Sequence, residues 1–258
     1  SEGTNFTGSL LIGHSTTGTI SSAEYNTGIG ISTLDALTSG DRNVAVGAFA
    51  GTNIDSATGN VLVGANSGDA LAGGSYNIAI GYHALSSEDG HGYNIAIGYG
   101  ALKDQNAGED AYNIAIGHNA GENVTTGRYN NLIGAFVGDA LTTGWSNIAI
   151  GYLALSAEDS GSDAIAIGRN ALQNQNYDGS SYNIAIGRDA GKEVTSGTHN
   201  TIIGGLAGDA LNSGGGNVAI GTEALSAEDG HGRNIAIGVS ALKVQDAGQD
   251  AYNVAIGY

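Results

Sequence analysis

The chain is built from a five-residue motif that recurs about every 17 residues from one end to the other. The motif reads Asn-Ile-Ala-Ile-Gly, with small variations. Its closing glycines are Gly13, Gly30, Gly47, Gly64, Gly81, Gly98, Gly117, Gly134, Gly151, Gly168, Gly187, Gly204, Gly221, Gly238 and Gly257. A short, fixed period predicts stacked units that each contact their neighbours, rather than one globular core. We therefore interpret residues 1–258 as a single repeat array, and we expect it to be a fragment of a longer fibrous protein.

Each motif has the pattern of a short β-strand that ends in a glycine. Residues i and i+2 of a strand share a face, so the two branched residues point one way and the alanine between them points the other. The glycine offers a backbone conformation with positive φ, or room for the backbone of the next unit. Two well-formed examples consist of Asn94, Ile95, Ile97 and Gly98, and of Asn183, Ile184, Ile186 and Gly187.

The length of the unit selects the fold class. Seventeen residues are too few for a repeat that contains a helix, but they suffice for short strands and turns wound into one coil. We therefore predict an all-β protein, a parallel β-solenoid (β-roll) of about 15 coils with 17–19 residues in each. The pattern alone leaves open which strand face is buried. We expect the branched pair to fill the coil, which would leave the alanine face for packing between chains.

The remainder of the unit comes in two kinds, which alternate two by two. One kind reads Gly-x-x-Ala-Leu, as at Leu85 and Leu102. The other reads Gly-x-x-Ala-Gly or a near variant, and its apolar residue comes three positions later, as at Val124 and Leu141. The alternation produces a super-repeat of four coils and 70 residues.

Composition excludes several classes of partner. The formal net charge is −17, from 8 basic and 25 acidic residues, so we expect no binding to nucleic acid. No apolar run approaches the roughly 20 residues needed to span a bilayer, so we expect no membrane insertion by this segment. Cysteine is absent, and a repeat spreads Ser, His and Asp along the array rather than gathering them in a pocket. We therefore predict no enzymatic activity, no catalytic residue and no organic cofactor.

Two residue columns have structural interpretations beside functional ones. Asparagine begins 13 of the 15 motifs, and stacked asparagines could form a hydrogen-bonded ladder or simply favour a tight turn. Tyrosine often precedes that asparagine, and such a column could stack ring on ring or bind sugars. We favour the stacking. The tyrosines concerned are Tyr25, Tyr76, Tyr93, Tyr112, Tyr129, Tyr182 and Tyr252.

Acidic loops in the Ala-Leu coils are the best candidates for a metal site. Loops of adjacent coils would bring carboxylates together, which is what Ca²⁺ requires. A solvated, self-repelling loop explains them too, and we favour that interpretation. The candidate ligands are Glu88, Asp89, Asp104, Glu109, Asp110, Glu158, Asp159, Glu228 and Asp229. Of the six histidines, His91 and His231 share a register but lie eight coils apart, and the others fall in scattered registers, so we expect no histidine site within one chain. The six are His14, His83, His91, His118, His199 and His231.

The units Asn-Ile-Ala-Ile-Gly-x-x-Ala-Leu, and the segment from Asn43 to Gly51, resemble the YadA-like head repeats of trimeric autotransporter adhesins. Similar repeats occur in phage tail-fibre proteins. The resemblance covers about Leu10 to Tyr258 and implies a left-handed, homotrimeric β-roll that is extracellular, on a cell or virion surface, and used for attachment. The units are longer than the usual head repeat, and no neck, stalk or anchor is visible.

These observations predict a non-enzymatic, structural or adhesive segment of an attachment fibre, either an adhesin head or a tail-fibre shaft. Its partners would be copies of itself and a cell-surface receptor or glycan. The alternative is a self-assembling extracellular filament or sheath protein whose exposed β-edges stack head to tail.

Overall fold

The computed structural model describes residues 8–13, 21–246 and 248–258, and within these ranges it consists of strands, turns and loops without a helix. It is a parallel β-solenoid, as the repeat predicted. The chain divides into two compact units, Ser1–Tyr129 and Asn130–Tyr258. No helix among the described residues has the length and apolar character of a membrane span.

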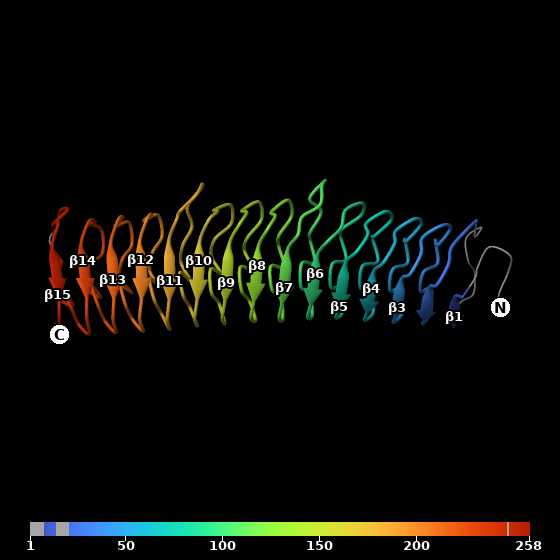
Figure 1. Cartoon of the computed structure of the whole chain (residues 1–258), viewed down its shortest axis with the longest axis horizontal. Helices are drawn as coiled ribbons and strands as arrows, with labels where there is room; N and C mark the ends of the chain where they lie inside the picture. Colours follow the sequence, from blue (N-terminus) through green and yellow to red (C-terminus); the bar gives the residue numbers. More distant parts are fainter. Residues whose placement is uncertain (1–7, 14–20, 247) are drawn as a thin grey trace. The chain divides into compact units, whose positions relative to one another are not determined.

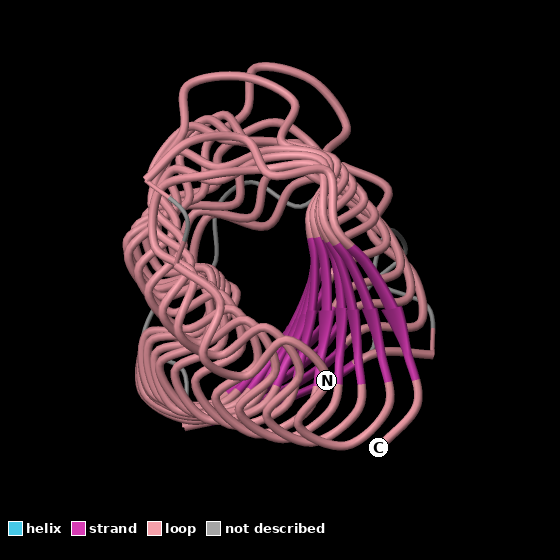
Figure 2. Cartoon of the chain, turned by 90° about the vertical axis from the view of Figure 1, so that its left-hand side faces the viewer, coloured by secondary structure: helices cyan, strands magenta, loops and turns pink. Residues whose placement is uncertain are grey.

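Each coil contributes one strand of three residues (Figure 1). The strands of the first unit are β1 (Leu10–Ile12), β2 (Thr27–Ile29), β3 (Val44–Val46), β4 (Val61–Val63), β5 (Ile78–Ile80), β6 (Ile95–Ile97) and β7 (Ile114–Ile116). Those of the second are β8 (Asn131–Ile133), β9 (Ile148–Ile150), β10 (Ile165–Ile167), β11 (Ile184–Ile186), β12 (Thr201–Ile203), β13 (Val218–Ile220), β14 (Ile235–Ile237) and β15 (Val254–Ile256). The strands form one wall of the coil, and turns and loops form the others (Figure 2).

Strands that follow one another within a unit pair in parallel and in register. Ala79 of β5 lies opposite Ala96 of β6, and Ala166 of β10 lies opposite Ala185 of β11. The closing glycines form a column beside this ladder, where Gly81 has φ +141°. A Cβ on Gly81 would overlap the carbonyl oxygen of Gly98 in the next coil. Glycine therefore serves both expected purposes at once: positive φ and close approach of backbones.

The buried face of the strand is the alanine face, so the expectation that the branched pair fills the coil is wrong. Ala79 and Ala96 have no exposed surface, whereas Ile95 and Ile97 on either side are partly exposed. The interior is already occupied by leucines such as Leu85 and Leu102, which are fully buried. Only a small side chain fits between them and the strand, so the larger aliphatic residues point outward.

The two kinds of coil fill the interior with an apolar side chain at different positions. In Ala-Leu coils the leucine side chain, for example Leu85 at φ 52°, enters the core from a left-handed backbone position. In the other kind a glycine such as Gly68 has that position, and the fully buried Leu71 supplies the apolar side chain three residues later. A Cβ on Gly68 would lie 2.8 Å from both Leu62 and Leu71. The strand residue is accordingly enlarged from Ala to Leu at position 62.

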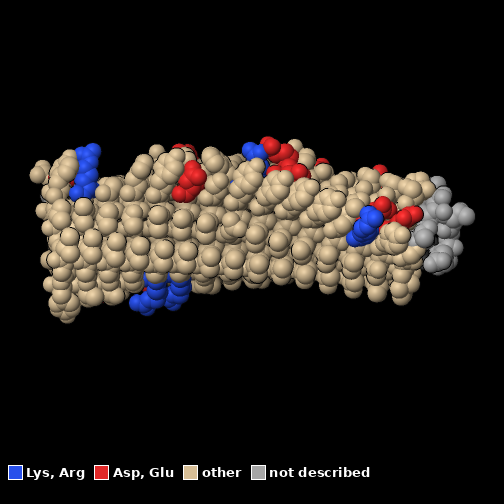
Figure 3. All heavy atoms as spheres, in the orientation of Figure 1, with Lys and Arg blue, Asp and Glu red and all other residues tan. Residues whose placement is uncertain are grey.

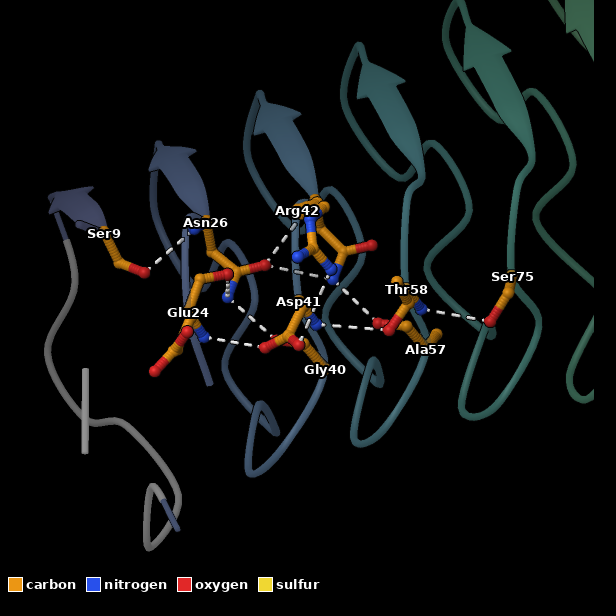
Figure 4. A network of polar contacts seen from close by, with 10 residues as sticks. Ser9, Glu24, Asn26, Gly40, Asp41, Arg42, Ala57, Thr58 and Ser75 are labelled. Atoms are coloured by element: carbon orange, nitrogen blue, oxygen red, sulfur yellow. Dashed lines mark hydrogen bonds and ion pairs between the residues drawn. The ribbon is translucent and has the colours of Figure 1, made fainter. Parts of the chain in front are cut away.

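The asparagines do form a ladder, but it joins side chain to backbone more than amide to amide. Oδ1 of Asn26 accepts the backbone N–H of Asn43 at 2.9 Å, and Oδ1 of Asn43 accepts that of Asn60 at 3.0 Å. Nδ2 of Asn43 also donates to the Ala57 carbonyl at 2.8 Å, across the interior of the coil. Ser9 replaces asparagine in the same role, accepting from Asn26 N–H at 2.8 Å (Figure 4). Each side chain therefore fixes the register of two adjacent coils and links two sides of its own coil.

A second ladder, which was not predicted from the sequence, runs beside the first in the opposite direction. Backbone N–H groups of Glu24, Asp41 and Thr58 donate to side-chain oxygens one coil further on. The acceptors are Asp41, Thr58 and Ser75, at 2.8 Å, 3.3 Å and 3.0 Å (Figure 4). The signal was available in this part of the chain, since Asp41, Thr58 and Ser75 each stand two residues before the asparagine of a motif.

Candidate functional site

In each unit the outer strand face consists of the first and third residues of each strand, and it is largely apolar. In the first unit every such position of β1–β7 is Leu, Ile or Val except Thr27. In the second unit the exceptions are Asn131 and Thr201. These side chains are partly or largely exposed, for example Val44 at 38% and Ile133 at 37%. The charged side chains visible in Figure 3 lie over the turns and not on the band of strands.

Tyrosine rings stack along the column that precedes the asparagines. In the first unit the ring centroids of Tyr76 and Tyr93 lie 5.3 Å apart, those of Tyr93 and Tyr112 5.1 Å, and those of Tyr112 and Tyr129 5.7 Å. The stacking that we favoured is therefore confirmed for this run. The faces of the inner rings are covered by their neighbours, so only ring edges and hydroxyl groups are open to a sugar or receptor.

A second aromatic column follows the closing glycines and was not found from the sequence. Tyr82 stacks on Tyr99 at 5.5 Å, and Tyr99 stacks on His118 at 5.0 Å. Like the first column, it joins successive coils through ring contacts, which contribute about 0.5–1.5 kcal/mol for each aromatic pair. Its signal in the sequence is a tyrosine directly after the motif.

Three acidic residues occupy a column that holds leucine, isoleucine, valine or glutamine in the other described coils. Glu88, Glu158 and Glu228 each follow the core leucine of an Ala-Leu coil by three residues. That is the register of Leu71 and Val124 in the other kind of coil, and all three glutamates are fully buried. Burial raises the pKa of Glu88 and of Glu158 because the charged form loses its hydration.

Histidine lies beside two of these glutamates. Nδ1 of His91 is 3.4 Å from Oε1 of Glu88, and Nδ1 of His231 is 3.2 Å from Oε1 of Glu228. The same glutamate oxygens accept the backbone N–H groups of these histidines, at 3.2 Å and 3.1 Å. The expectation that histidine forms no site within one chain overlooked this pairing. The repeated sequence Glu-Asp-Gly-His-Gly, at 88–92 and at 228–232, was the available signal.

Two groups of metal-ligating side chains result. Glu88, Asp89 and His91 each present a ligand atom, and these atoms lie within 4.8 Å of one another. The second group satisfies the same criterion with Glu228, Asp229, His231 and Asp246. Oε2 of Glu88 and Oε2 of Glu228 are buried and have no hydrogen-bond partner.

The middle copy is different. Oε2 of Glu158 accepts from Nε2 of Gln175 at 3.0 Å and from the backbone N–H of Tyr177 at 3.3 Å. Glycine stands at position 161, where the other two loops have histidine. Asp159, the neighbouring candidate, accepts backbone N–H groups of Thr142 and Thr143 through its carbonyl oxygen. Glu158 and Asp159 do not form a group of three ligands.

The other calcium candidates have partners of a different kind. Asp104 lies 3.8 Å from Nζ of Lys103, Glu109 pairs with Arg128, and Asp110 accepts the backbone N–H of Gly92 at 3.0 Å. None of the three belongs to a group of ligands among the described residues. His83, His118 and His199 also lie outside both groups, and His14 lies outside the described residues.

The geometry thus leaves an apolar outer strand face, two aromatic columns and two acidic loops with histidine as the surfaces with functional character. No protein-family model, no curated protein and no solved structure matches the chain.

Proposed function

We propose that the chain is a non-enzymatic, structural segment of an extracellular attachment fibre, on a cell or virion surface, in which copies associate through the outer strand face. The observation that carries the proposal is the chemistry of that face: Leu, Ile and Val in rows, without charge, and partly exposed. Contiguous exposed apolar surface on a protein marks an interaction site.

Packing inside the coil does not require apolar side chains on the outer strand face. Strand alanines such as Ala96, the core leucines and the asparagines already fill the interior. Moreover, parallel sheets occur almost only where both faces are covered. One face of the parallel strands is covered by the loops of the chain's own coils, and we infer that a second copy covers the other.

In a closed symmetric oligomer, the outer strand face of every copy is covered. Three identical flat faces that meet about an axis leave no apolar face exposed, whereas an open stack would leave the rows uncovered. A trimer is also what the resemblance to adhesin head repeats implies. The two ladders and the aromatic columns supply rigidity along each chain, and repeated weak contacts on the outer turns would add up to strong attachment through effective concentration.

The test is the oligomeric state of the purified chain, measured by sizing chromatography with light scattering. We expect discrete trimers, and we expect the double variant Ile97→Asp/Ile167→Asp to be a folded monomer with an unchanged circular dichroism spectrum. The matched control is Gly73→Asp, an exposed position at which a Cβ would meet nothing within 4 Å.

Wild-type chain that stays monomeric at high concentration would contradict the proposal. Long uniform filaments under the electron microscope would instead favour the head-to-tail polymer.

A further inference from the structure

We propose that the loop of Glu228, Asp229 and His231, together with Asp246 from the following coil, binds a divalent transition metal of the zinc class, and that the loop of Glu88, Asp89 and His91 binds it more weakly. The inference concerns a ligand rather than association between copies, so it stands independently of the proposed fibre.

The first step is the buried glutamate. Glu228 occupies a core register where other coils have leucine, isoleucine, valine or an uncharged glutamine, and its Oε2 has no hydrogen-bond partner. A buried polar atom without a partner costs about 1–3 kcal/mol, and more when it carries charge. Glu88 has the same burial and the same unpartnered oxygen. A cation at the end of each loop would remove this cost.

The second step is the spacing of the ligands. Two ligands that are each about 2.1 Å from a tetrahedral zinc ion lie about 3.4 Å apart. Oε1 of Glu228 and Nδ1 of His231 are 3.2 Å apart, and the corresponding atoms of Glu88 and His91 are 3.4 Å apart. The nitrogen and one carboxylate oxygen therefore already stand at the separation that a shared metal requires.

The third step is the identity of the donors. An imidazole nitrogen among carboxylates suits zinc and its first-row neighbours, whereas Ca²⁺ takes oxygen ligands. The second-unit loop has four donors, which is the coordination number of zinc. In the first unit Asn106 stands where Asp246 does, so that site lacks the fourth carboxylate. The difference between Asp and Asn at this register sets the expected order of affinity.

The loop that holds these donors is itself fixed. The backbone N–H of His231 donates to Glu228, and that of Gly232 donates to Oδ1 of Asp250 at 2.9 Å. The Asp229 carbonyl accepts the N–H of Asn212 from the preceding coil. The donors are therefore positioned before the metal arrives, and Asp246 would connect the loop to the next coil through the ion.

The test is a calorimetric titration of the full chain with ZnCl₂ at pH 7.5, after treatment with a chelator. We expect two sites, one at least tenfold tighter than the other. His231→Ala should abolish the tight site, Asp246→Asn should weaken it at least tenfold, and His91→Ala should remove the weak site alone. The control variants Asp159→Asn, in the middle loop, and His83→Ala should leave both sites unchanged.

A second measurement checks the coordination. Co²⁺ bound at the tight site should give intense visible absorption bands typical of tetrahedral nitrogen and oxygen ligands, and His231→Ala should lose them. The proposal is overturned if zinc gives no saturable heat, if binding survives in the double variant His91→Ala/His231→Ala, or if Ca²⁺ binds as tightly as zinc. Circular dichroism of each variant establishes that the coils are still folded.

Discussion

Single residues act in this fold by joining one coil to the next, and asparagine is the clearest case. Asn43 donates its own N–H to Asn26, accepts the N–H of Asn60 and donates Nδ2 to the Ala57 carbonyl. It is fully buried, so no solvent can replace these partners. One side chain thus serves two parts of the backbone, and the N–H of the same residue is held by the side chain of the preceding coil.

We expect Asn43→Ala to lower the free energy of unfolding by about 2–4 kcal/mol, because it leaves a buried N–H and a buried C=O without partners. Asn43→Ser should cost about half as much. Serine keeps the acceptor, as Ser9 does for Asn26, but lacks the amide donor. Urea unfolding of the three proteins gives the comparison, and equal losses for Ala and Ser would show that the acceptor contributes nothing.

The closing glycines are equally specific. Gly81→Ala would place a Cβ against the backbone carbonyl of Gly98 at a φ of +141°, where both the clash and the backbone conformation are unfavourable. We expect a loss of about 3 kcal/mol or more in unfolding free energy, or no folded protein. Gly90→Ala is the matched control, since nothing lies within 4 Å of its Cβ. Thermal unfolding followed by circular dichroism distinguishes the two variants.

At the scale of one coil, a buried glutamate such as Glu88 makes the free energy of unfolding depend on pH. Burial raises the pKa of Glu88, so the folded chain binds its proton more tightly than the unfolded chain does. The buried carboxylate therefore lowers stability at neutral pH, and this loss disappears as the pH falls below the ordinary glutamate pKa, where both states are protonated.

We accordingly expect Glu88→Gln to stabilise the chain at pH 7 and to change little near pH 4, with measurements made in chelator so that bound metal plays no part. Glutamine keeps an oxygen to accept the His91 N–H, so the loop conformation is preserved. Unfolding curves across this pH range provide the measurement. A destabilised Glu88→Gln at pH 7 would show that the ionised form is favoured.

The coil also shows where sequence reasoning succeeds and where it ends. The period and the place of a strand in each unit followed from the spacing of the motif, because backbone pairing repeats wherever the sequence repeats. The expected strand covered about five residues, whereas the observed strands have three. The direction of the branched pair did not follow, because alternation assigns two faces without saying which is inside. That choice depended on the volume of Leu85 and Leu102 across the coil. The pairing of His231 with Glu228 was missed because histidines were compared only with one another.

For the molecule as a whole, an array of coils should tolerate the removal of one complete coil. Deleting residues 61–77 joins Asn60 to Ile78 and keeps every strand and asparagine in register. The coil that begins at Gly47 would then be followed by the Ala-Leu coil at Gly81, a succession that also occurs from Gly134 to Gly151. Since each coil depends mainly on its neighbours, we expect a folded protein whose unfolding enthalpy is lower by about 12 kcal/mol per chain, at about 0.7 kcal/mol for each residue near 60 °C.

Deletion of residues 61–69 is the control. It removes half a coil, so the chain would return to the wrong wall and the Asn60 side chain would lose the Gly74 carbonyl that it now contacts at 2.9 Å. Calorimetry of both deletions decides the matter. If the full-coil deletion were as disruptive as the half-coil deletion, stability would have to come from contacts that reach beyond neighbouring coils.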